Sequence, residues 1–118
     1  MGVRSSFYGV EIGVSEGGRV EIGEDCLFAS NVEIRNGDSH PIIDLVTGLR
    51  INRAADVIVG GHVWLGTRVL VLKGSRIGSG CAVGAASVVT GDIPESSLAV
   101  GSPAKVLRAG IRWDRELP

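Results

Sequence analysis

The sequence predicts an all-β fold, a solenoid in which short parallel strands and turns wind into a narrow coil, and three observations indicate it. Aliphatic residues recur at every sixth position, glycines often follow them, and the composition suits a slim interior. Of the 118 residues, 44% are hydrophobic, only 4% are aromatic and 18 are glycine, a glycine content well above average. The length suits one domain, which we assign to residues 1–118.

The six-residue spacing is unbroken over residues 57–89. It is set by the inward anchors Val59, Leu65, Val71, Ile77, Val83 and Val89, each preceded two positions earlier by a smaller or β-branched residue: Val57, Val63, Val69, Ser75, Cys81 and Ser87. A period of six fits no amphipathic helix, whereas two inward residues separated by one outward residue describe a very short strand. We expect the glycines after several anchors, such as Gly60 and Gly66, to supply backbone freedom for the turns.

The same pairs occur upstream, as Val20/Ile22, Cys26/Phe28 and Val32/Ile34. If three six-residue units complete one coil, residues 18 apart stack at about 4.8 Å as neighbouring parallel strands. Cys26 and Cys81 both fall in the smaller inward position, which predicts buried thiols rather than a disulfide.

One segment interrupts the repeat. Ile34 and Val59 are 25 residues apart, which is not a multiple of six. Residues 37–56 are rich in turn formers and charges, so we predict a loop that leaves the solenoid. The loop contains His40, one of only two histidines, and loops on rigid scaffolds often carry the chemistry of a protein.

Composition excludes several functions. The net charge of −1 gives no reason to expect nucleic-acid binding. No apolar run reaches 18 residues, so we expect no membrane span. No charged-then-apolar signal opens the sequence, and we expect the cytoplasm. Two histidines cannot supply a three-histidine zinc site, and we expect no metal.

The run "VIVGGHVWLGTRVLVLKGSRIGSGCAVGAASVVTGDIPESSLAVGSPAKVLR" (57–108) resembles the hexapeptide-repeat acyltransferases, most closely those of sugar O-acetyltransferase type. "DSHPI" (38–42), "TG" (47–48) and "IN" (51–52) extend the likeness over about the last two thirds of the chain. The resemblance implies a left-handed parallel β-helix, a homotrimer with active sites between subunits, acetyl-coenzyme A as donor and a hydroxyl group as the usual acceptor.

The resemblance also implies a base. His40-Pro41 matches the family's histidine-proline pair, so His40 would remove the proton of the attacking hydroxyl. Asp38 is a candidate substrate-binding residue, and either Asp38 or a backbone carbonyl could hold the other ring nitrogen of His40. The alternative for His40 is a solvated turn residue before a proline.

The family's coenzyme contacts match six residues of this sequence: Trp64, Thr67, Ala85, Thr90, Lys105 and Arg108. Alternation points Trp64 outward. The resemblance implies that its ring lies beside the pantetheine arm; the alternative is a trimer contact, and both can hold. Thr67 and Ala85 are 18 apart and therefore stack on one edge. Lys105 and Arg108 could meet phosphates, or be solvated charges.

Other positions are less specific to the chemistry. Residues 103–113 open with a proline, and we predict a short helix that caps the last coil. His62 falls at an outward corner and is interpreted as a surface or subunit-contact residue. Gly91 and Ser102 replace the Lys and Asn usual in the family, and residues 1–35 match weakly, which bears on acceptor choice.

We therefore predict an acetyl-coenzyme A-dependent O-acetyltransferase that acts on a sugar or polysaccharide precursor by direct attack, without a covalent enzyme intermediate. Two alternatives remain at this stage: N-acetylation of an amino sugar or antibiotic on the same scaffold, and a non-catalytic solenoid that serves as an assembly module.

Overall fold

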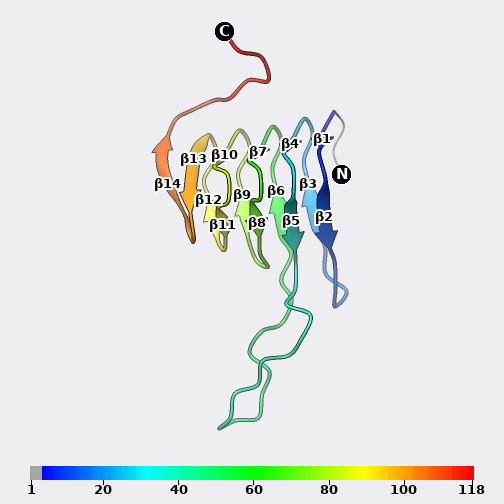
Figure 1. Cartoon of the computed structure of the whole chain (residues 1–118). Helices are drawn as coiled ribbons and strands as arrows, with labels where there is room; N and C mark the ends of the chain where they lie inside the picture. The colour runs from blue at the N-terminus through cyan, green and yellow to red at the C-terminus, as the bar shows by residue number, and fades with distance from the viewer. Residues whose placement is uncertain (1–3) are drawn as a thin grey trace.

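The structure, a computed structural model, describes residues 4–118, so residues 1–3 of the predicted domain lie outside it. The chain winds into successive coils of three short strands each (Figure 1). The first two coils contain β1 (Ser6–Phe7), β2 (Val10–Gly13) and β3 (Val20–Ile22), then β4 (Leu27–Phe28), β5 (Val32–Arg35) and β6 (Val57–Val59). The next two contain β7 (Trp64–Leu65), β8 (Leu70–Val71) and β9 (Arg76–Ile77), then β10 (Ala82–Val83), β11 (Val88–Val89) and β12 (Asp92–Ile93). The final strands are β13 (Ser97–Gly101) and β14 (Ala104–Ala109).

Strands from successive coils form three sheets along the solenoid. The first has the order β1-β4-β7-β10-β13-β14, the second β11-β8-β5-β2 and the third β12-β9-β6-β3. The coil-to-coil pairs are parallel, for example Val88 with Leu70 and Val89 with Val71. The predicted solenoid of short parallel strands is therefore confirmed.

The interior is the predicted one. All twelve inward residues assigned between positions 57 and 89 are at most 2% exposed. Cys26 and Cys81 are buried free thiols, and burial raises the pKa of both. The six-residue spacing thus identifies the inward-facing side chains correctly. The core is narrow, and Phe28 is the aromatic residue among its largest fully buried side chains.

The glycines that follow the anchors have a different role from the predicted one. The backbone turns in the left-handed region two residues later, at His62, Arg68, Gly74, Gly80 and Ala86. A Cβ added to Gly78 would lie 2.5 Å from the Glu95 backbone nitrogen of the next coil. These glycines are needed because the next coil lies too close for a side chain.

The interruption of the repeat is a long loop between β5 and β6 that projects away from the coils (Figure 1). Its two arms pair as in a hairpin: the Ile51 N–H donates to the Ile42 carbonyl (2.9 Å), and Ile43 and Arg50 form an antiparallel bridge. At the tip, the backbone N–H groups of Thr47 and Val46 donate to the Asp44 carboxylate and lower its pKa.

The predicted capping helix over 103–113 is wrong. Residues 104–109 form β14, which pairs antiparallel with β13 and is the last strand of the first sheet (Figure 1). Gly101, with φ of 110°, and Pro103 turn the chain back. The backbone N–H and C=O groups at the free edge of β13 need hydrogen-bond partners. A second strand supplies them, whereas a helix uses its own backbone groups internally.

After β14 the chain returns along one corner of the solenoid. The Ile111 N–H donates to the Ser96 carbonyl (2.9 Å), Trp113 is buried against His62, and Arg115 reaches Asp25 (3.1 Å). We call residues 111–115 the C-terminal segment. Within the described residues, no helix has the length and apolarity needed to cross a membrane.

Candidate functional site

An apolar groove runs along the outer surface of the first sheet. Trp64, which is 41% exposed, lies beside Ala82 and Leu98 because these residues pair in register across β7, β10 and β13. Thr67 and Ala85, in the turns after β7 and β10, line the same groove, whose volume is about 390 Å³. The structure thus brings together three of the six predicted coenzyme contacts: Trp64, Thr67 and Ala85.

The two basic residues lie on the strand at the end of this sheet. Arg108 of β14 pairs with Leu98, a residue that lines the groove, and Lys105 pairs with Val100. Both basic side chains are exposed. Thr90, in contrast, is exposed after β11 in the second sheet and does not line the groove.

His40 lies in the projecting loop, away from this groove. The loop starts where the second sheet gives way to the third, whereas the groove lies on the first sheet. The His40 side chain is exposed, and within residues 4–118 its imidazole has no hydrogen-bond partner. Neither Asp38 nor a backbone carbonyl of the described chain holds the second ring nitrogen.

Two ion pairs tie the base of the loop to neighbouring coils. Lys73, after β8, donates to the Asp38 carboxylate (2.6 Å), and Arg50 pairs through both terminal nitrogens with Glu16, in the turn between β2 and β3. Lys73, and after it Asn52, hold the pKa of Asp38 below its usual value of 3.8. The Arg50 guanidinium lowers the pKa of Glu16. Both carboxylates are therefore charged at neutral pH and committed to cations.

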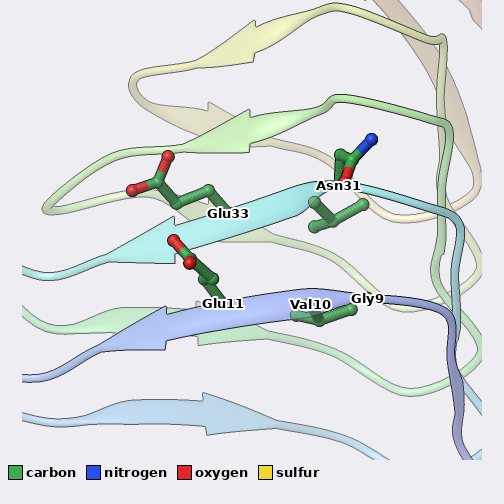
Figure 2. A pocket seen from close by; sticks show the side chains of 6 residues that line it. Gly9, Val10, Glu11, Asn31 and Glu33 are labelled. Atoms are coloured by element: carbon green, nitrogen blue, oxygen red, sulfur yellow. The ribbon is translucent and has the colours of Figure 1, made fainter.

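A second hollow, of about 490 Å³, lies on the second sheet between β2 and β5. Figure 2 shows that Glu11 and Glu33 project into it from neighbouring strands, where they pair directly. Glu33 pairs with Arg35 of the same strand, but two carboxylates against one cation leave the hollow negative, which disfavours phosphate groups. This hollow is therefore a poor place for a coenzyme that carries phosphates, and the groove beside Trp64 is the better one.

His62 holds the C-terminal segment. Its Nδ1 lies 2.8 Å from an Asp25 carboxylate oxygen, and its ring stacks on Trp113 at a centroid distance of 4.0 Å. The Trp113 indole N–H donates to the His62 carbonyl (2.8 Å). Hydrogen bonds from His62 and then Arg115 lower the pKa of Asp25. His62 does lie at a corner, and its neighbours there are residues of its own chain.

Sequence reasoning missed three residues near the site. Trp113 lies 6.0 Å from Trp64, between ring centroids; Lys73 pairs with Asp38; and Asn52 is buried at the base of the loop. Only Asn52 had a signal, because it belongs to the "IN" pair of the resemblance. Among the described residues, no three His, Cys, Asp or Glu side chains gather as metal ligands would.

The three-sheet solenoid built on six-residue units superposes on solved structures of acetyltransferases. Close structural matches have the same fold, the left-handed parallel β-helix. In sequence and in structure, the chain is similar to hexapeptide-repeat acyltransferases of sugar O-acetyltransferase type. No protein-family model matches the chain.

Particular relatives give more detail. The polysialic acid O-acetyltransferase of Escherichia coli O1:K1 / APEC is 42% identical over 96 residues, covering 81% of this chain and 31% of the relative. The crystal structure of the polysialic acid O-acetyltransferase OatWY superposes with a TM-score of 0.95 at 40% identity, covering 98% of this chain and 56% of that one. A maltose O-acetyltransferase from Clostridium difficile 630 gives a TM-score of 0.67 at 27% identity, covering 94% and 71%.

The chain is much shorter than these polysialic acid O-acetyltransferases. It spans about a third of the E. coli relative and just over half of the OatWY chain. The superposition on the OatWY chain covers 98% of this chain and therefore includes its coils and its loop.

Proposed function

We propose that this chain transfers an acetyl group from acetyl-coenzyme A to a hydroxyl group of a sugar or a polysaccharide precursor, with His40 as the general base. The observation that carries the proposal is the apolar groove, in which Trp64, Thr67 and Ala85 lie together. The relatives support the acceptor class, since their names specify O-acetyl transfer to polysialic acid and maltose.

The groove suits an extended, mostly apolar arm. Thr67, Ala82 and Ala85 leave room along its floor because their side chains are small, and the Trp64 indole forms a wall. Arg108 and Lys105, on the neighbouring strand, would meet phosphates by charge. Bound acetyl-coenzyme A would supply a thioester, an activated acyl group. Thr90 as a further contact and Asp38 as a substrate-binding residue stay predictions.

His40 would complete the site from another copy of the chain. Within one chain its loop and the groove occupy different sides of the solenoid, so we propose a homotrimer in which each loop reaches the groove of a neighbour. There, the imidazole would accept the proton of the acceptor hydroxyl as its oxygen attacks. The buried free thiols Cys26 and Cys81 favour a reducing compartment, and we propose the cytoplasm.

The first prediction tests this assignment. His40→Ala should lower kcat by about 10²–10⁴, the usual contribution of a positioned general base, and leave the KM for acetyl-coenzyme A nearly unchanged. The assay detects free coenzyme A thiol with oligomeric sialic acid, maltose and an amino sugar as acceptors. Ser39→Ala, the adjacent exposed position, is the matched control and should keep the wild-type rate.

Three outcomes would contradict the proposal. Near-wild-type turnover by His40→Ala would remove His40 from the mechanism. Preferred acetylation of the amino sugar on its nitrogen would replace a hydroxyl acceptor with an amine. Calorimetric titration without coenzyme A binding would indicate a non-catalytic assembly module.

A further inference from the structure

Asn52 is the one deeply buried side chain of segment 38–53, where the other residues are exposed or half-buried: only 4% of Asn52 is exposed. It lies in the second arm of the loop, shortly before β6, and contacts Asp38 and His40 of the first arm. A buried amide is costly unless its hydrogen-bonding groups are paired. The partners of Asn52 therefore show what this side chain does.

All four hydrogen-bonding positions of the Asn52 amide are used. Its Nδ2 donates to the His40 carbonyl (2.8 Å) and to the Asp38 carboxylate (3.1 Å). Its Oδ1 accepts from the Ile42 N–H (2.7 Å) and from Arg50 Nε (3.2 Å). Two donors and two acceptor positions are the full capacity of this side chain.

Two of these partners are themselves tied to other coils. Asp38 accepts from Lys73 of the third coil, and Arg50 pairs with Glu16 of the first. Asn52 thereby connects the backbone that follows the His40 Cα, through the His40 carbonyl and the Ile42 N–H, and the Asp38 side chain to the solenoid. The His40 imidazole has no hydrogen-bond partner of its own within the described residues, so these backbone bonds set where the ring can lie.

We propose that Asn52 is a positioning residue, which fixes the backbone of residues 38–42 so that the His40 ring lies where the reaction needs it. This inference rests on the proposed function, because it acts through His40. A misplacement of about 1 Å can cost about 10² in rate, so the four hydrogen bonds of one amide have a large effect on turnover without contact with the substrate.

Asn52→Asp is the sharpest variant. It has the same shape and keeps an acceptor for Ile42 and Arg50, but it removes both donated hydrogen bonds and places a carboxylate beside that of Asp38. We expect kcat to fall about 10- to 100-fold, with the coenzyme A Kd and the KM for acetyl-coenzyme A unchanged. Asp44→Asn, at the tip of the same loop, is the control and should change kcat less than about twofold.

The deciding measurement is a double-mutant cycle of Asn52→Asp with His40→Ala. If Asn52 acts through His40, Asn52→Asp lowers kcat in the wild type but causes no further loss when His40 is absent. An equal further loss in the His40→Ala background overturns the role of Asn52 while the proposed function stands. Full activity of His40→Ala alone overturns the proposed function instead, so the two failures are distinguishable.

Folding is checked by circular dichroism and thermal unfolding. Asn52→Ser, which is uncharged and keeps one hydroxyl donor, serves as the second variant, and it should lose less kcat than Asn52→Asp. If neither variant folds, Asn52 is a folding residue and the positioning role is overturned.

Discussion

Several positions of the coil accept only glycine, because any side chain there would collide with the next coil. Gly60 and Gly78 have ordinary backbone angles, but a Cβ on either would lie within 2.6 Å of a backbone nitrogen of the next coil. Real Cβ atoms do not approach backbone so closely, and the neighbouring coil would have to move away. The spacing between coils, about 4.8 Å, thus depends on glycine at these points.

Gly78→Ala should lower the free energy of unfolding by about 1–3 kcal/mol, the usual cost of inserting a methyl group where there is no room. Chemical denaturation followed by circular dichroism measures this change. Gly91→Ala is the matched control, because nothing lies within 4 Å of the added Cβ and its φ is not left-handed, so we expect a change below about 0.5 kcal/mol. Equal stability of the two variants would refute the argument from close packing.

At the scale of the element, Trp113 is the main residue that holds the C-terminal segment against the coils. Trp113 is 6% exposed although it belongs to a stretch without secondary structure. It stacks on His62, donates to the His62 carbonyl and accepts from the His62 ring through its own carbonyl. Arg115 then adds contacts with Asp25 and the Cys26 carbonyl.

Trp113→Ala should release this segment from the solenoid while the coils remain folded, because the stacked ring and its indole hydrogen bond are lost together. Trypsin cleavage after Arg112 and Arg115 should then be about tenfold faster or more, since cleavage follows local opening. Leu117→Ala, which alters a side chain that is 95% exposed, should cleave at the wild-type rate. Unchanged cleavage in Trp113→Ala would show that other contacts hold the segment.

At the scale of the whole molecule, the proposed site needs two copies of the chain. The loop with His40 and the groove with Trp64 lie on different sides of the solenoid. A base from one copy and a coenzyme groove from the next make activity a property of the assembly.

Mixing two inactive variants tests this arrangement. His40→Ala keeps the groove and Trp64→Ala keeps the base, so randomly mixed trimers should have both intact partners at about a quarter of their sites. Co-expression of the two should therefore restore up to about a quarter of the wild-type rate, measured by thiol release. Each variant alone is the control. No recovery in demonstrably mixed trimers would place base and groove in the same chain.

Local patterns predicted the coils well and the long-range contacts poorly. The six-residue spacing identifies Val59 or Leu65 as interior because the direction of a strand side chain depends on its nearest sequence neighbours. The same local reasoning predicted a helix over residues 103–113. It could not show that these residues meet the free edge of β13, where pairing favours a strand. Asn52 joins Asp38, His40 and Arg50 only once the loop has folded. The sequence therefore does not predict the role of Asn52, beyond the match of the "IN" pair (51–52) to the family.

A stack of coils ordinarily frays from its ends, since each repeat touches only the repeats beside it. The C-terminal segment changes that rule here: within five residues it contacts Ser96 near one end, His62 in the middle and Asp25 near the other. Because this segment joins the terminal coils, they should not unfold separately. We expect the solenoid to unfold in one cooperative transition instead of coil by coil.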